Sequence, residues 1–234
     1  MTQNLMLQTQ QLTKTFKDTQ AVRGISLHIP KGKVYGLLGP NGAGKSTTLK
    51  MFTGMLKPTS GNILFDGHIW SRQDLKAIGA LIEHPPVYDN LTAFENLKVR
   101  ACLCDVDFRQ ASAVLKLVEL EHTGKKRAGS FSMGMKQRLG IAMALINRPK
   151  FLILDEPANG LDPIGIQDLR RLIRRLSDNG ITVLLSSHIL SEVALMADYI
   201  GIINNGVLGY EGAITPGQDL EALFMQVVQA TQEV

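Results

Sequence analysis

Residues 39–46 constrain the fold of this chain more than any other stretch. They read Gly-Pro-Asn-Gly-Ala-Gly-Lys-Ser and fit the phosphate-binding pattern G-x-x-x-x-G-K-[ST] at every constrained position. The residues before the loop, 33–38, predict a strand, and residues 46–52 predict a helix. A strand, a glycine-rich loop and a helix in this order form the phosphate-binding unit of nucleotide-binding α/β proteins. This setting distinguishes the motif from a glycine turn that fits by chance.

The residue types of this loop suit a triphosphate. Glycines let successive backbone N–H groups turn toward phosphate oxygens, and the helix that follows points its positive dipole end at the same anions. Lys45 is expected to reach the β- and γ-phosphates and to assist catalysis, while the Ser46 hydroxyl is expected to ligate Mg²⁺. The nucleotide-binding residues predicted here, with ATP and Mg²⁺ as cofactors, are Gly39, Asn41, Gly42, Gly44, Lys45, Ser46 and Thr47.

A second chemical stretch follows the apolar run 151–154, where Asp155 and Glu156 stand side by side. The carboxyl end of a buried parallel strand is where α/β folds bind their ligands. We expect Asp155 to hold Mg²⁺ through its water shell and Glu156 to act as the catalytic base that orients or deprotonates the attacking water. The alternative is structural, because a carboxylate before Pro157 could simply cap a turn.

Composition limits the remaining classes. With 234 residues, 44% of them apolar, the chain can bury one large core, with or without a lobe. It lacks a run of about eighteen apolar residues, and its N-terminus lacks a signal pattern, so we expect a cytoplasmic protein. The formal charge is +4, and the paired arginines at 170–171 and 174–175 fall outside the apolar stripe of their predicted helix. We favour a solvated face there over a nucleic-acid surface, and expect no nucleic-acid partner.

Periodicity predicts an α/β fold with a parallel sheet core, an antiparallel β subdomain and an inserted α-helical subdomain, which together with the phosphate loop resembles the RecA-like P-loop NTPase class. Alternating residues predict antiparallel strands at 5–16, 21–29 and 62–69, and helical patterns follow from about 91 to 146. Apolar strands at 151–154 and 181–185 alternate with helices, as in a buried parallel sheet. The predicted divisions are 1–82 and 146–215 for the nucleotide-binding core, 83–145 for the helical subdomain, and 216–234 for a C-terminal helix.

A third stretch, residues 131–138, reads Phe-Ser-Met-Gly-Met-Lys-Gln-Arg at the start of a predicted helix. A serine and a glycine at a helix N-terminus form another phosphate-binding end. The order of the phosphate loop, this stretch, Asp155-Glu156, the run Gly-Leu-Asp at 160–162 and the run Ser-Ser-His at 186–188 resembles the ATP-binding cassette ATPases over nearly the whole chain.

That resemblance implies a dimer in which each nucleotide lies between two copies. Ser132 and Gly134 of one copy would close over the γ-phosphate held by the other, and Asp162 would order the opposing site. His188 resembles the switch histidine of the family, which contacts the γ-phosphate and is counted among the catalytic residues. Phe16 resembles the aromatic residue that stacks on adenine, although a core-strand aromatic is the alternative.

The chain departs from the family pattern at two places. Met133 and Met135 replace a glycine and a glutamine of the signature stretch, which affects the geometry of closure, and Glu83 follows the predicted strand at 78–82 where the family has a metal-contacting glutamine. Because an ionised carboxylate only accepts hydrogen bonds, we expect Glu83 to approach phosphate through Mg²⁺.

Glu83 and the residues around it are similar to the ATPases of bacitracin-type and lantibiotic self-protection exporters. The resemblance implies an exporter subunit that hydrolyses ATP, works as a dimer (most simply a homodimer) and is attached to the inner face of the membrane through a separate permease. Export of another substrate, such as a drug, an ion or a lipid, and a regulatory cassette without transport are the alternatives.

Overall fold

A six-stranded sheet forms the centre of the molecule in the computed structural model, which describes residues 4–215 and 217–231. Its strands lie in the order β11-β10-β4-β9-β8-β7. The first five strands counted from β7 run parallel, and β11 is antiparallel to β10 at the edge. The bounds are β4 Val34–Leu38, β7 Ile78–Leu81, β8 Phe151–Leu154, β9 Thr182–Ser187, β10 Tyr199–Asn204 and β11 Val207–Ala213.

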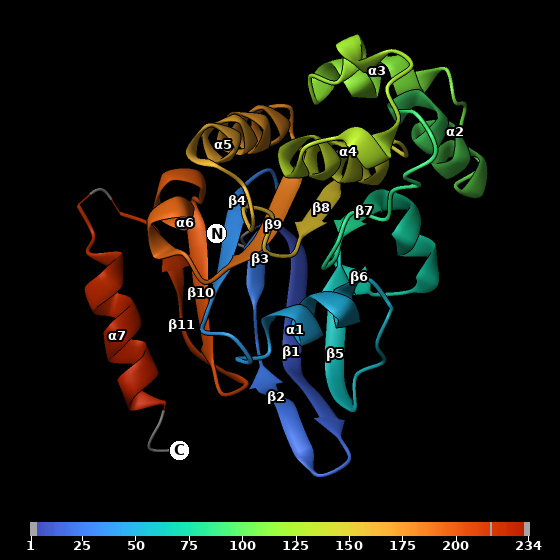
Figure 1. The fold of residues 1–234 in the computed structure, drawn as a ribbon. Helices are drawn as coiled ribbons and strands as arrows, with labels where there is room; N and C mark the ends of the chain where they lie inside the picture. The colour runs from blue at the N-terminus through green and yellow to red at the C-terminus, as the bar shows by residue number, and fades with distance from the viewer. Residues whose placement is uncertain (1–3, 216, 232–234) are drawn as a thin grey trace.

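Both faces of this sheet are covered, which explains why its central strands are buried and largely apolar. Every residue of β4, β8 and β9 is buried. Val34 and Leu38 of β4 belong to the core on one face, and Tyr35 and Leu37 belong to the core on the other. The first face carries α4 (Met133–Leu145), α5 (Pro163–Asp178) and α6 (Leu190–Met196), and the second packs on α1 (Lys45–Phe52) and the antiparallel layer (Figure 1).

The antiparallel layer is a five-stranded sheet centred on β1 (Leu5–Phe16), which pairs with β2, β3 and β5. Two of its predicted strands are each divided in the structure. The strand predicted at 21–29 is part of β2 (Thr19–Ile25) and of β3 (His28–Pro30), and the strand at 62–69 divides into β5 (Ser60–Phe65) and β6 (His68–Ile69). Asp66 and Gly67, both with positive φ, form the turn in the second case.

A helical segment extends beside β7 (Figure 1). It contains α2 (Ala93–Leu103), α3 (Gln110–Leu117) and α4, with short 3₁₀ turns at Glu121–Thr123 and Ala128–Ser130. Another 3₁₀ turn, Arg72–Ala77, precedes β7. Thr92 starts α2 because its hydroxyl accepts a hydrogen bond from Glu95 N while the Glu95 carboxylate accepts one from Thr92 N. The α/β fold predicted from the sequence, with a parallel core, an antiparallel layer and inserted helices, is confirmed.

Sequence reasoning missed the hairpin of β10 and β11, which continues the parallel sheet beyond β4. The signal was present, because Asn205 and Gly206 form a turn of positive φ between two apolar stretches. The final helix, α7 (Leu220–Ala230), packs on α6 and on this hairpin. The ends of the predicted C-terminal helix, residue 216 and residues 232–234, lie outside the described residues. None of the helices found in the described ranges is both long and apolar enough to cross a bilayer.

The four arginines at 170–171 and 174–175 lie on α5 and each contacts a carboxylate. Their partners are Glu192, Asp168, Asp198 and Glu119, in that order. Their charge is therefore neutralised by neighbouring acids of this chain, as the solvated-face interpretation expects.

Candidate functional site

The phosphate loop joins β4 to α1 and needs glycine for steric reasons. Gly44, at the N-cap of α1, has φ of 104°, and a Cβ built there would lie 2.5 Å from the carbonyl oxygen of Ala21. Gly42 has φ of 81°. Residues with a side chain rarely adopt these angles, so the glycines predicted from the motif are required by the backbone itself.

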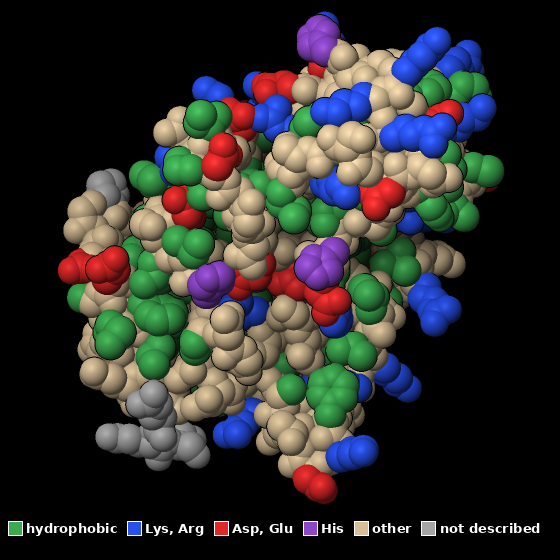
Figure 2. Space-filling view, in the orientation of Figure 1, with side chains coloured by type: hydrophobic (Ala, Val, Ile, Leu, Met, Phe, Trp, Pro, Cys, Tyr) green, Lys and Arg blue, Asp and Glu red, His purple; other side chains and the backbone are tan. Residues whose placement is uncertain are grey.

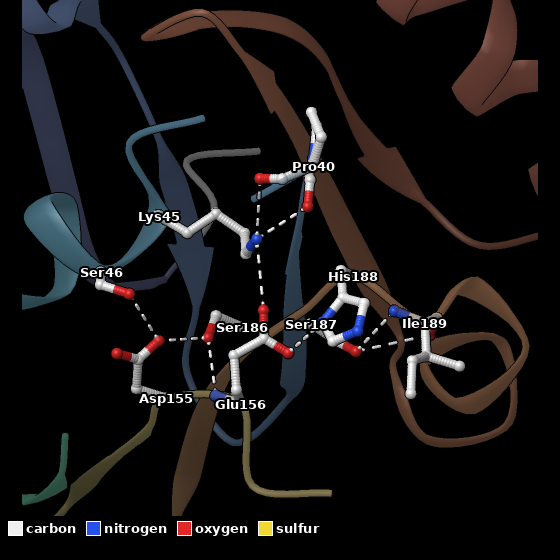
Figure 3. Close-up of polar contacts among 10 residues, drawn as sticks. Pro40, Lys45, Ser46, Asp155, Glu156, Ser186, Ser187, His188 and Ile189 are labelled. Atoms are coloured by element: carbon white, nitrogen blue, oxygen red, sulfur yellow. Dashed lines mark hydrogen bonds and ion pairs between the residues drawn. The ribbon is translucent and has the colours of Figure 1, made fainter. Parts of the chain in front are cut away.

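Lys45 lies inside this loop with its side chain only 5% exposed. Its ammonium donates hydrogen bonds to the carbonyl oxygens of Gly39 (2.7 Å) and Pro40 (3.1 Å), and it lies 3.2 Å from Glu156 Oε1 (Figure 3). A buried ammonium is costly unless it is paired, and these three oxygens provide the pairing. When a phosphate is bound, the three N–H donors of the ammonium can bind its oxygens in place of these acceptors.

Asp155 follows β8 and is 3% exposed. Its Oδ1 accepts hydrogen bonds from the hydroxyls of Ser46 (3.1 Å) and Ser186 (2.6 Å), which come from α1 and β9. Ser186 also accepts a hydrogen bond from the backbone N–H of Glu156 at 2.9 Å. One hydroxyl thus orients both acids (Figure 3). No individual role for Ser186 was predicted from the sequence, although its place at the end of a buried strand beside β8 was the available signal.

We expect Ser186→Ala to weaken both the fold and the site. Asp155 and the Glu156 N–H each lose a buried partner, which costs about 1–3 kcal/mol in the free energy of unfolding. Because the Ser186 hydroxyl orients Asp155 and Glu156 without being expected to touch the nucleotide, its loss should lower ATP turnover roughly 10–100-fold. Urea unfolding and phosphate release measure the two effects. Ser187→Ala is the matched control, since the buried Ser187 hydroxyl accepts a hydrogen bond from Ile189 N and contacts neither acid. Equal losses in both variants would contradict the expectation.

Glu156 has a left-handed backbone, with φ of 48°. This conformation is uncommon for a residue with a side chain, and it occurs preferentially at functional positions. It directs the two carboxylate oxygens to different partners. Oε1 faces Lys45, and Oε2 lies 2.8 Å from Nδ1 of His188, whose ring is 39% exposed. The turn-capping alternative leaves these contacts unexplained.

The structure therefore brings five predicted residues together, from the phosphate loop and the ends of β8 and β9. They are Lys45, Ser46, Asp155, Glu156 and His188. Figure 2 shows acidic side chains grouped between two histidines near the middle of the exposed face, flanked by basic side chains. The site thus combines fixed positive charge, backbone donors and paired carboxylates, which is the set of groups that phosphoryl transfer uses.

Four other predicted residues lie apart from this cluster. Phe16, at the end of β1, is 44% exposed and has the Lys14 ammonium 5.0 Å from its ring centre, so the core-aromatic alternative is wrong. Ser132 caps α4 by accepting a hydrogen bond from Met135 N, and Gly134 lies in the first turn. Asp162 caps α5 by accepting one from Gly165 N. None of the contacts described for residues 4–215 and 217–231 joins them to Lys45 or Glu156.

Glu83 has a partner that the sequence did not predict. Its carboxylate lies 2.6 Å from the Lys50 ammonium of α1, and 59% of its side chain is exposed. The hydrogen bond from Lys50, reinforced by the lysine charge, lowers the pKa of Glu83 below its ordinary value. No contact described here joins Glu83 to Ser46 or Asp155, so its role toward a metal stays a prediction.

Comparison with known proteins identifies the family. The family model described as ABC transporter matches residues 22–159, which include the phosphate loop, the 131–138 stretch and Asp155-Glu156. The chain belongs to the ABC transporter family. As an ATPase of this family it binds nucleotide, as the motifs predicted.

Relatives of this ATPase include two transport proteins and a solved cassette. The lantibiotic transport ATP-binding protein SrtF of Streptococcus pyogenes is 50% identical over 94% of this chain and 96% of its own length. The bacitracin transport ATP-binding protein BcrA of Bacillus licheniformis is 47% identical over 87% of this chain and 68% of its own length. The dimeric cassette MJ0796, in a post-hydrolysis state with ADP and Pi, is 26% identical with a TM-score of 0.80, covering 90% and 99%. The resemblance drawn from the motifs is confirmed.

Proposed function

We propose that this protein is the ATP-hydrolysing subunit of an exporter that removes a lantibiotic- or bacitracin-type peptide through a separate membrane permease. The observation that carries the ATPase part is the contact between Glu156, Lys45 and His188 at the carboxyl edge of the sheet. The peptide class is supported by the 50% identity to a lantibiotic transport protein and the 47% identity to a bacitracin transport protein.

In the proposed reaction Glu156 accepts a proton from the water that attacks the γ-phosphate. His188, at hydrogen-bond distance from the same carboxylate, holds it and contacts the γ-phosphate. Lys45 pairs with Glu156 before nucleotide binds. When phosphate oxygens bind the lysine instead, the Glu156 carboxylate loses this partner and can accept a hydrogen bond from the attacking water.

Mg²⁺ fits the residues that are present. Ser46 and Asp155 offer a hydroxyl and a carboxylate oxygen 3.1 Å apart at the edge of the phosphate loop. The described residues contain no group of three or more acids, histidines or cysteines arranged to hold a metal alone. That suits Mg²⁺, which takes few protein ligands and completes its shell with phosphates and water. When bound, it would neutralise charge on the phosphates, with Ser46, Asp155 and, through a rearrangement, Glu83 as its protein ligands.

A second copy of the chain is needed to complete the site. Ser132 and Gly134 start a helix whose N-terminus suits an anion, yet they lie apart from the Lys45 cluster of their own chain. We propose that they close over the γ-phosphate of the partner copy, with Asp162 beside them. The dimeric state of a relative bound to ADP and Pi supports this arrangement. The helical segment, residues 83–145, is then the part that faces the permease, and the protein is peripheral to the membrane.

The test is ATP turnover against protein concentration. A composite site predicts Mg²⁺-dependent activity that rises more steeply than linearly, about fourfold per doubling when dimer is scarce, by mass action. The transport part is tested by expressing the protein with the permease that co-purifies with it in a peptide-sensitive strain. Survival should increase with the wild-type chain and not with Glu156→Gln. Linear activity would overturn the dimer, and unchanged survival with active ATPase would overturn the peptide class.

A further inference from the structure

Lys50 joins the nucleotide-binding helix to the segment that leads into the helical region. It lies on α1, the helix that begins at Lys45, and its ammonium contacts Glu83 Oε1 at 2.6 Å. Glu83 belongs to the connecting segment, residues 82–92, which runs from β7 to α2. Of the hydrogen bonds and ion pairs formed by the described residues, this pair alone joins α1 to the connecting segment.

The other end of the connecting segment is firmly attached to the helical region by its backbone. The carbonyl oxygens of Asp89 and Leu91 accept hydrogen bonds from Gly129 N (2.9 Å) and Ala128 N (2.8 Å), just before α4. The buried side chain of Asn96 accepts a hydrogen bond from Tyr88 N and donates one to Tyr88 O. These contacts fix residues 88–91 to the region that carries Ser132.

Further contacts tie the same part of the segment to α4 itself. The Lys136 ammonium of α4 lies 2.9 Å from the Asp89 carboxylate. A Cβ added at Gly140 of α4 would lie 2.9 Å from Pro85 Cβ, so the proline ring packs closely on the backbone of α4 there. Several contacts thus attach the connecting segment to α4, whereas the Lys50–Glu83 pair is its one polar link to α1 among the described residues, beside the apolar packing of Ile82 on the core that includes α1.

The stretch between the two attachments is stiff. Pro85 and Pro86 fix their φ angles, and the Val87 N–H donates a hydrogen bond to the Pro85 carbonyl oxygen. Glu83, with φ of 63°, is the turn that precedes this stretch. A displacement of Glu83 is therefore passed along the segment more readily than it is absorbed within it.

We propose that Lys50 is a positioning residue that couples nucleotide binding at the phosphate loop to the placement of α4 and Ser132, by holding Glu83. The inference rests on the proposed function, because it needs α1 to bind ATP. An exposed ion pair contributes little to folding, but it can shift the balance between two arrangements by about two- to fivefold. Because the ion pair is weak, a small change at the nucleotide site is enough to form or break it.

The test measures amide hydrogen exchange of residues 82–92 with and without ATP, in a Glu156→Gln background that prevents turnover. ATP should change the exchange of this segment, and Lys50→Met should reduce that change by about two- to fivefold. ATP affinity should stay within about twofold, because the ligating end of α1 is intact. Lys50→Arg keeps a positive charge opposite Glu83 and should retain most of the response.

The matched control is Lys31→Met, which removes a similarly exposed lysine that pairs with Asp66 in the antiparallel layer. It should leave the ATP response of residues 82–92 as it is. An ATP response that persists in Lys50→Met, no ATP response in the parent, or a response lost in Lys50→Arg as fully as in Lys50→Met would each overturn the role of Lys50. Failure of the proposed function appears separately, as absence of ATP binding or of hydrolysis by the chain with Glu156 intact.

Discussion

Glu156→Gln is expected to stop ATP hydrolysis almost completely while ATP still binds. Removing a general base typically costs about 10²–10⁴ in rate. Glutamine keeps the shape of the side chain and can still hydrogen-bond His188 Nδ1, so the site should not collapse. The variant also frees Lys45 from its carboxylate partner, and ATP affinity should therefore be kept or increased. Single-turnover hydrolysis and equilibrium ATP binding measure the two effects.

A second readout of the same variant is its oligomeric state. Bound ATP that is not hydrolysed should trap the dimer, which size-exclusion chromatography detects as an ATP-dependent shift. Glu121→Gln makes the same chemical change on an exposed carboxylate of the helical segment and should behave as wild type. Turnover by Glu156→Gln within about tenfold of wild type would remove Glu156 from the role of general base.

Lys45→Ala is expected to lose both nucleotide binding and turnover. A hydrogen bond to a charged group is worth about 1.5–3 kcal/mol, so the loss of the ammonium should weaken ATP binding roughly 10–100-fold. The change also leaves the carbonyl oxygens of Gly39 and Pro40 without their buried donor and Glu156 without its counter-charge. Titration calorimetry measures the affinity, and thermal unfolding reports the loosened loop.

Lys45→Arg tests whether charge alone is sufficient. The guanidinium is a wide planar fork, whereas the lysine ammonium is a compact donor held between two carbonyl oxygens in a site that is 5% exposed. Arginine should therefore restore little of the affinity. A dissociation constant for Lys45→Ala within twofold of wild type would contradict the phosphate-binding role.

The fold and the central cluster could be predicted because they depend on local patterns. The phosphate loop is contiguous, and Asp155-Glu156 and Ser186-Ser187-His188 each follow a buried apolar strand. Strands β8 and β9 are neighbours in the sheet, so their carboxyl ends meet. Because buried parallel strands are short apolar runs, their presence in the central sheet could be predicted from residue types alone.

Other contacts depend on side chains that meet only in the folded chain. The Lys50–Glu83 pair joins residues 33 positions apart, and neither residue type by itself indicates the other. Glu83 was predicted as a metal ligand from its charge alone, because the sequence does not show that Lys50 lies beside it. Ser186 was missed for a similar reason, since a serine at a strand end has many structural uses and only the distances to Asp155 and Glu156 identify this one.

At Glu156 the left-handed backbone lowers the stability of the fold, while the carboxylate is needed for ATP turnover. A residue with a side chain held at this φ costs roughly 1–2 kcal/mol that glycine would not incur, and asparagine would incur less of it. Selection for a robust fold alone would therefore favour replacement of this acid. Its retention requires continued selection for turnover, and a lineage that kept the cassette only as a nucleotide-binding scaffold should drift to glycine or asparagine here before the phosphate loop decays.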